Sequence, residues 1–192
     1  MTAAGVLELH ARTTGWRREL PIPVESIVVA SYGMRAIWQD IAELRRERIL
    51  AEINPKARVI ALNQRHSDEL LDNGNLPPFR LAHLLGHYLY DADHGSALID
   101  HPVFCRAPAT AEANPVRETN ADGFAVALLL PTVLVRAQVA RGPRRPQTRL
   151  QLQDRAAGWG VSAPVLRARL QELSLDWSLP AERPTRSAGP RS

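Results

Sequence analysis

The chain has 192 residues, of which 45% are hydrophobic and 23% charged, with a formal net charge of +4. Such a chain is long enough for one well-packed domain and a small second unit. Its single cysteine excludes an internal disulfide. The N-terminus lacks the basic start and apolar core of a signal peptide, and the longest apolar run, 124–135, is too short to span a bilayer. We therefore expect a soluble, cytoplasmic protein that does not contact a membrane.

The N-terminal third is expected to contain a flexible arm and three strands. Residues 1–20 show no clear hydrophobic period and are interpreted as a flexible arm. Residues 23–29 predict a short helix, because a proline stands at its first turn. A turn sequence at 54–57, Asn-Pro-Lys-Ala, separates the last two strands and predicts a hairpin. The strands are expected at 34–40, 48–53 and 58–63.

The middle of the chain is expected to be mainly helical. A polar loop at 66–77 should lead into a helix over 78–91. Residues 92–115 contain three prolines and are predicted to be irregular. A second helix is expected over 117–130, ending at a proline, and residues 132–141 should resume as helix.

The C-terminal part predicts a helical pair followed by a tail. Helices are expected over 149–158 and 163–173, with Ser162 as the N-cap of the second. The tail is rich in proline, arginine and serine, a composition typical of disorder. We therefore divide the chain into an arm at 1–20, a main domain at 21–141, a helical subdomain at 146–178 and a disordered tail at 179–192.

Two histidines on the 78–91 helix suggest a metal site. His83 and His87 are four residues apart, so they lie about 40° apart on one face and can both bind one zinc ion. Zinc needs a third protein ligand, and Glu118 opens the next strong helix. Asp122, one turn further on, could accept the free ring N–H of a ligand histidine. The same pattern also arises by chance, and a carboxylate at a helix start is favourable to the dipole.

The residue after the first histidine is unusual. In an H-E-x-x-H metalloprotease this position holds the glutamate that acts as general base, whereas here it holds Leu84. A helical wheel places Leu84 on the histidine side, so we expect it beside the metal and not in the core. The residues predicted to face the core lie opposite: Leu81, Leu85, Tyr88 and Leu89.

Two stretches resemble the ImmA/IrrE family of zinc metallopeptidases. Residues 79–89 read FRLAHLLGHYL and residues 118–131 read ETNADGFAVALLLP. Family members carry a stretch similar to R-F-T-x-A-H-E-x-G-H and then E-x-x-A-N-x-F-A-x-x-L-L-M-P. The resemblance extends back to 59–63 and forward through 157–170.

The resemblance implies an α+β fold. It would consist of a zincin-like metallopeptidase core, with a small antiparallel-type sheet packed on helices, and a C-terminal helix-turn-helix-like helical subdomain. It also implies that one Zn²⁺ is bound by His83, His87 and Glu118. The chain departs from the family motif at Leu84, which replaces the glutamate, and mildly at Asp122, which replaces an asparagine.

The departure at Leu84 bears directly on activity. A general acid–base group contributes ~10²–10⁴-fold to a rate, and leucine cannot take a proton. We therefore assign no catalytic residue and expect an impaired metalloendopeptidase. The family resemblance implies a regulatory role on a helix-turn-helix transcriptional repressor, in the stress response or in mobile-element derepression. One alternative is a pseudopeptidase that sequesters the repressor without cleaving it.

A second alternative is a DNA-binding regulator that acts through the C-terminal helices. Arg144, Arg145 and Arg149 lie at the start of that subdomain and could contact phosphates. The simpler interpretation is that these arginines belong to a solvent-exposed basic linker. The helix expected at 163–173, which would have to read the bases, begins with Ala163 and Pro164, and neither side chain can read base edges. A repressor protein is thus the expected partner, and DNA the less favoured one.

Overall fold

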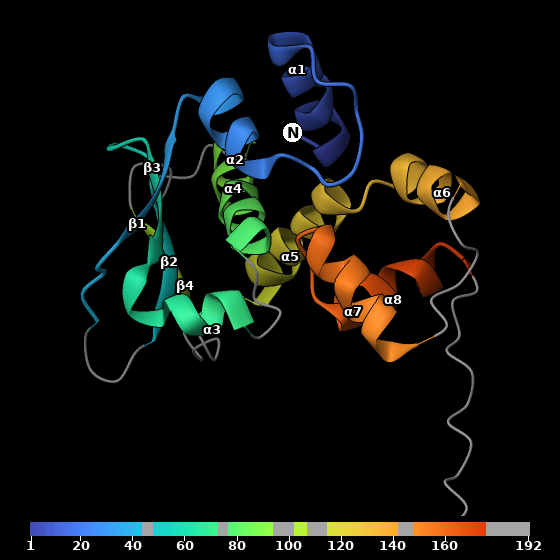
Figure 1. The fold of residues 1–192 in the computed structure, drawn as a ribbon. Helices are drawn as coiled ribbons and strands as arrows, with labels where there is room; N and C mark the ends of the chain where they lie inside the picture. Colours follow the sequence, from blue (N-terminus) through green and yellow to red (C-terminus); the bar gives the residue numbers. More distant parts are fainter. Residues whose placement is uncertain (44–47, 73–76, 94–101, 107–114, 142–147, 176–192) are drawn as a thin grey trace, which may run out of the picture.

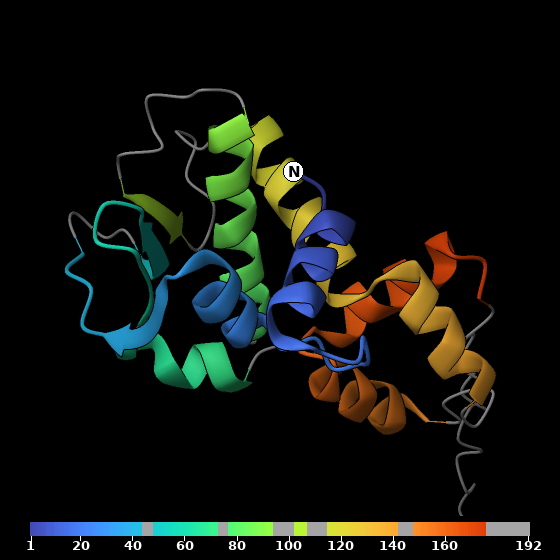
Figure 2. The same ribbon diagram turned by 90° about the horizontal axis from the view of Figure 1, so that it is seen from above.

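The computed structural model describes residues 1–43, 48–72, 77–93, 102–106, 115–141 and 148–175. Its layers follow one another in a simple order. A small sheet lies on one side, helix α4 (Pro77–Asp93) lies against it, and α5 (Pro115–Leu129) lies beyond α4 (Figure 1; Figure 2). This mixed helix and sheet architecture confirms the expected α+β class.

The sheet has four strands in the order β1-β3-β2-β4. The turn at 55–58 joins β2 to β3 in antiparallel register, which confirms the expected hairpin. The expectation of an antiparallel-type sheet is incomplete, because β1 pairs with β3 in parallel. The fourth strand lies in the segment that was predicted to be irregular, where it pairs with β2. The strands are β1 (Arg35–Gln39), β2 (Ile49–Asn54), β3 (Val59–Asn63) and β4 (Val103–Arg106).

The predicted flexible arm is instead a helix, α1 (Ala3–Thr14), packed on the core. The Thr2 hydroxyl accepts a hydrogen bond from the amide of Gly5, which caps the helix start. Buried residues recur along one face of α1 at the helical spacing of three and four residues. That pattern was present in the sequence, but it is short and mixed with small residues. The buried residues are Ala3, Val6, Leu7 and His10.

Two short helical segments surround the start of the sheet. The helix expected near 23–29 is confirmed as α2 (Val24–Ser26) followed by a π-helical turn, η1 (Ile27–Ser31). The loop expected at 66–77 was wrong in part, because η2 (Gln64–His66) and α3 (Ser67–Asp72) form there. Asp68 and Glu69 in the first turn of α3 favour a helix, because carboxylates stabilise the positive end of the helix dipole.

The predicted C-terminal helices are present as α6 (Thr132–Arg141), α7 (Arg149–Gly158) and α8 (Ala163–Glu172). The Ser162 hydroxyl accepts a hydrogen bond from the Val165 amide at 3.4 Å, which confirms the expected N-cap. Arg169 donates to the carbonyl of Leu130 at 3.1 Å, so α8 is tied to the end of α5. The predicted tail at 179–192 lies outside the described residues, and the helix-turn-helix assignment stays a prediction.

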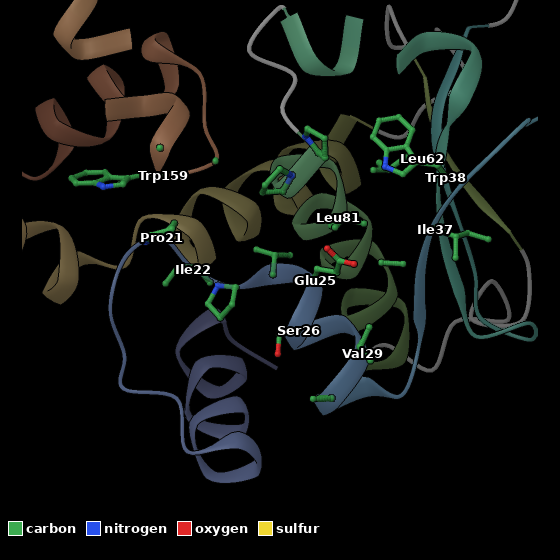
Figure 3. A pocket seen from close by; sticks show the side chains of 18 of the residues that line it. Pro21, Ile22, Glu25, Ser26, Val29, Ile37, Trp38, Leu62, Leu81 and Trp159 are labelled. Carbon is green, nitrogen blue, oxygen red and sulfur yellow. The ribbon is translucent and has the colours of Figure 1, made fainter. Parts of the chain in front are cut away.

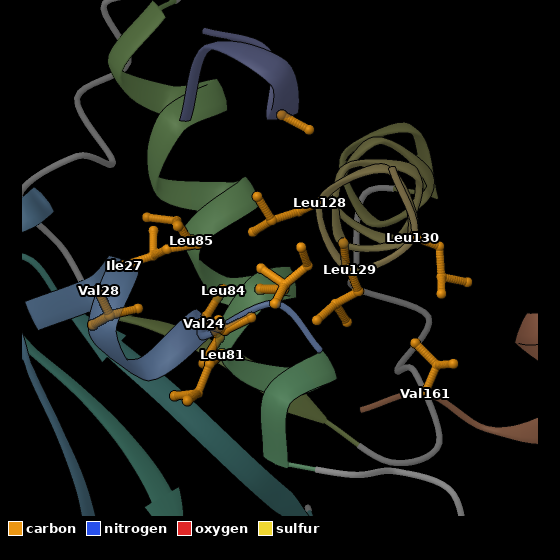
Figure 4. Packing of buried hydrophobic residues seen from close by; sticks show 14 of the residues in the cluster. Val24, Ile27, Val28, Leu81, Leu84, Leu85, Leu128, Leu129, Leu130 and Val161 are labelled. Carbon is orange, nitrogen blue, oxygen red and sulfur yellow. The ribbon is translucent and has the colours of Figure 1, made fainter. Parts of the chain in front are cut away.

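Most of the buried apolar side chains form one core between α4, α5 and the α2–η1 segment (Figure 4). Leu81 and Leu85 of α4 face this core, as the helical wheel predicted, and Leu128 and Leu129 of α5 meet them there. Side chains of α7 and α8 belong to the same core. Among the described residues, no one helix has both the length and the apolarity to cross a membrane; α5 and α6 meet that requirement only together, across a 42° bend.

Candidate metal centre

Three side chains from α4 and α5 converge on one point. The Nε2 atoms of His83 and His87 lie 3.0 Å apart. Glu118 Oε2 lies 3.4 Å from Nε2 of His83, and Glu118 Oε1 lies 3.3 Å from Nε2 of His87. Both histidines are buried, while Glu118 is half-buried in the first turn of α5. The structure thus brings together the three residues that the sequence suggested.

The spacing of these atoms fits tetrahedral zinc. Zinc–nitrogen bonds are about 2.0–2.1 Å, and two ligand atoms of a tetrahedron are then about 3.3 Å apart. The Nε2–Nε2 separation of 3.0 Å, and the two Nε2–oxygen separations of 3.3 and 3.4 Å, each to a different oxygen of Glu118, lie close to that value. Two imidazole nitrogens that face each other also need a proton or a cation between their lone pairs. Three protein ligands would leave the fourth zinc position open, as in catalytic sites.

Asp122 orients the first histidine. Its Oδ1 lies 2.8 Å from Nδ1 of His83. Because an ionised carboxylate can only accept a hydrogen bond, Nδ1 of His83 carries the proton and Nε2 is left with its lone pair toward the cation point. His87 differs, since its buried Nδ1 has no hydrogen-bond partner among the described residues. Glu118, Ala121 and Asp122 share one face of α5 because they are three and four residues apart.

The charges of the three groups also suit a cation. Burial, and after it the charge of neighbouring His83, lower the pKa of His87 to about 4, so His87 is a neutral ligand near neutral pH. Burial opposes protonation of His83 too, but its hydrogen bonds to Asp122 and Glu118 raise its pKa above 6.5. The hydrogen bond to His83 holds the pKa of Glu118 below its usual value.

These shifts predict a pH dependence of zinc binding. A proton and a zinc ion compete for Nε2 of His83, and the raised pKa of this histidine keeps the proton bound to higher pH. We expect zinc affinity to fall as the pH decreases from about 8 to about 6, with release of protons on binding. Glu118 stays ionised over that range, because its pKa is lowered. Calorimetry in buffers of different ionisation enthalpy measures both quantities, and a pH-independent affinity would contradict the assignment of His83.

The two helices approach each other closely at Gly86, next to His87. A methyl group placed on Gly86 would lie 3.0 Å from the Phe124 ring and 3.3 Å from the backbone of Ala121. The small residues Ala121 and Ala125 are buried on the facing side of α5. A side chain at position 86 would force the Phe124 ring or the Ala121 backbone to move by a few tenths of an ångström, close to the contacts between Glu118 and the histidines.

Gly86→Ala is therefore expected to destabilise the fold and to weaken zinc binding. The added methyl must push apart a packed pair of helices, an overpacking that typically costs about 1–3 kcal/mol, against about 1 kcal/mol gained from helix propensity. Gly123→Ala is the matched control, because Gly123 lies in α5 with no atom within 4 Å of its would-be methyl. Thermal unfolding should show a lower midpoint for the first variant and an unchanged or higher one for the second. Equal shifts for both would refute the packing argument.

The position of Leu84 differs from the expectation. The helical wheel placed it beside the metal, but its side chain is fully buried and belongs to the apolar core (Figure 4). The apolar face of α4 is wider than the wheel suggested, because α2 and α5 both cover it. The position that holds a general base in active metallopeptidases is thus filled by an apolar core side chain.

Two further side-chain pairs support the site, and the sequence provided no signal for either pairing. Arg117 Nη2 donates to Oδ2 of the buried Asp91 at 2.6 Å, so the first turn of α5 is tied to the end of α4 next to Glu118. Arg80 Nη1 lies 3.0 Å from Sγ of Cys105, which joins α4 to β4. Burial raises the pKa of the Cys105 thiol. Its side chain is buried in the core.

The proposed nucleic-acid contacts are only partly placed. Arg144 and Arg145 lie outside the described residues, whereas Arg149 is the exposed first residue of α7. The structure therefore does not bring the three arginines together into a described surface.

The chain is similar to known proteins in two of three comparisons. A family profile described as the IrrE N-terminal-like domain, a peptidase family, matches residues 39–171. No curated protein matches. Among solved structures, a transcriptional regulator from Mycobacterium tuberculosis superposes with a TM-score of 0.47 at 17% sequence identity, over 95% of this chain and 48% of that one. The chain thus spans about half the length of that regulator.

The profile match includes both helices of the candidate centre and the paired histidines, and it extends over well more than half of the sequence. A cluster of possible metal ligands, His83, His87 and Glu118, lies within the matched residues. From the helical arrangement and this match together, the chain belongs to the IrrE N-terminal-like domain family of peptidases.

Proposed function

We propose that this protein binds one Zn²⁺ through His83, His87 and Glu118 and acts on a helix-turn-helix transcriptional repressor, with impaired peptidase activity. The observation that supports this most is a combination. The Nε2 atoms of the two histidines lie 3.0 Å apart, and each lies 3.3 or 3.4 Å from one of the two oxygens of Glu118, while the neighbouring general-base position is an apolar core residue. The partner is inferred from the family alone.

Zinc, when bound, would polarise the carbonyl of the scissile peptide bond and lower the pKa of a bound water. The chain's own residues would hold the metal and balance its charge. Asp122 holds His83 in the tautomer that binds metal, and Glu118 contributes a negative charge. No residue on α4 is placed to take the proton from that water. Leu84 has no basic atom, and of the two carboxylates on α4, Asp91 is paired with Arg117 and Asp93 is in the last position of the helix.

A protein of this kind can regulate by binding. Loss of a general base lowers the rate of cleavage by ~10²–10⁴-fold. It leaves any surface that recognises the partner unchanged. The repressor would then be held intact, and the free concentration available to DNA would fall. Sequestration is therefore the mode of action that best fits a metal centre whose general-base position is occupied by Leu84.

The test combines metal analysis with incubation against the helix-turn-helix factor encoded nearest to this gene. We expect one zinc per chain by mass spectrometry of the purified protein, and a stable complex that contains the intact factor. Rapid cleavage that stops with a chelator would contradict the proposed impairment, and substoichiometric zinc after zinc loading would contradict the metal site. Salt-sensitive binding of duplex DNA by the protein alone would favour the DNA-binding alternative.

A further inference from the structure

A groove of about 790 Å³ lies on the side of α4 away from the metal centre. Its walls come from the α2–η1 segment, from β1, from the first turn of α4 and from the turn between α7 and α8 (Figure 3). None of the three candidate zinc ligands lines it. Leu81, which does, lies about 200° around the helix from His83. We call this hollow the Trp38 groove.

The groove is mainly apolar, and its polar side chains are the carboxylate of Glu25 and the hydroxyl of Ser26. Trp38 and Trp159 lie at opposite ends of it, and Glu25 extends into the space between them (Figure 3). Glu25 is the one charged residue among those that line it, and within the described part of the chain it makes no hydrogen bond or ion pair. Trp38 is 42% exposed and Val29 49% exposed, so two large hydrophobic side chains are open to solvent here. Exposed apolar side chains that line a groove are typical of binding sites.

One wall of the groove is the edge of the sheet. Among the described strands, β1 pairs with β3 alone. The amide of Arg35 donates to the carbonyl of Arg58, so the main-chain groups of Arg35 point toward β3. These groups alternate along a strand, and those of Ala36 and Trp38 therefore point away from β3. Both residues line the groove, as does Ile37 between them. An extended chain can add to such an edge by main-chain hydrogen bonds.

We propose that the Trp38 groove binds an extended peptide segment of a partner protein, in which a lysine or arginine is flanked by apolar residues. The main chain of the segment pairs along β1, its apolar side chains pack against Trp38 and Val29, and its cationic group reaches Glu25. A carboxylate attracts a cation by its charge, and a tryptophan ring attracts one through its face. This proposal goes beyond the metal centre and does not depend on it.

The probe is an immobilised library of blocked hexapeptides, in which one position at a time is fixed as arginine, leucine or glutamate and the others are mixed. The 192-residue chain carries a net charge of +4, so nonspecific attraction would favour the glutamate pools. We expect the arginine pools to bind about tenfold more strongly than the glutamate pools, with leucine favoured at neighbouring positions. This preference should persist when a zinc chelator is present, which separates it from the proposed metal function.

Variants define the site. Glu25→Gln should reduce the preference for arginine over glutamate to below about twofold, and Trp38→Ala should weaken binding of all pools about tenfold. Asp154→Asn removes an exposed carboxylate outside the groove and should change neither quantity. An arginine preference that survives Glu25→Gln, or the absence of any preference in the unmodified protein, would overturn the proposal.

Other occupants would give different results. If octylammonium ion at equal concentration displaces the arginine pools completely, the groove is a site for small cations and the partner peptide is refuted. If Trp177→Ala strengthens peptide binding tenfold or more, the C-terminal tail of the chain itself occupies the groove. If the protein alone self-associates in sedimentation and Glu25→Gln abolishes this, the occupant is a second copy. Each of these outcomes overturns the assignment to a partner protein.

Discussion

Replacing Leu84 with glutamate is expected to produce zinc-dependent cleavage of the partner repressor, roughly 10²–10⁴-fold faster than with the natural chain. The reason is local. Residue 84 follows His83 on α4, and a carboxylate there would be drawn toward the cation and could take a proton from the metal-bound water. Gel analysis of the repressor over time, with and without a chelator, measures the effect.

The same substitution should cost stability. Leu84 is fully buried in the apolar core, so a polar side chain loses apolar contacts and must find hydrogen bonds, at a cost of about 2–4 kcal/mol. Leu84→Gln is the matched control, because glutamine has nearly the same size and cannot act as a base. Both variants should unfold at a lower temperature, but only the glutamate variant should cleave. Cleavage by both, or by neither while zinc remains bound, would refute the general-base interpretation.

Removing one ligand is expected to abolish useful zinc binding. His83→Ala deletes one of three converging ligands and should lower zinc affinity by more than about 100-fold, whereas Asp122→Asn, which only orients His83, should lower it by about 10–100-fold. The ratio of the two effects is informative, because a mere loss of fold would affect both variants alike. Competition with a chromophoric chelator measures the affinities.

Thermal unfolding provides an independent measure of the same site. Zinc that binds the folded state stabilises it by about 2.7 kcal/mol at a concentration 100 times its dissociation constant. We expect this zinc-dependent increase of the midpoint for the natural chain and not for His83→Ala. His66→Gln is the control, because His66 pairs with Glu43 away from the centre. A zinc-dependent increase that survives His83→Ala would place the metal elsewhere.

Much of the site could be anticipated because its residues follow local rules. His83 and His87 had to share a face of any helix that contains both, and the helix itself follows from apolar periodicity. Glu118 and Asp122 had to share a face of α5 for the same reason. The geometry of a single helix did not predict the contact between α4 and α5. That contact depends on Gly86 fitting against Ala121, which is a property of two segments far apart in the chain.

The expectations that failed involve partners distant in sequence. The arm at 1–20 is a helix because its apolar stripe meets the core, and the hydrogen bond of His10 to Ser31 lies across 21 residues. Leu84 is a core residue because α2 and α5 cover its side of α4, which a wheel of one helix cannot show. Likewise β4 forms only because β2 is there to pair with it.

The order and type of most helices and the hairpin of β2 and β3 were determined by the sequence alone, through periodicity, capping and turn residues that act over a few positions. The zinc motif and its missing glutamate were equally evident there. Only the tertiary structure decided that three ligand atoms converge, that Leu84 is buried, that β1 runs parallel to β3, and that a groove with one carboxylate forms beside it. These depend on long-range packing, where the free energy belongs to pairs of segments and not to either one.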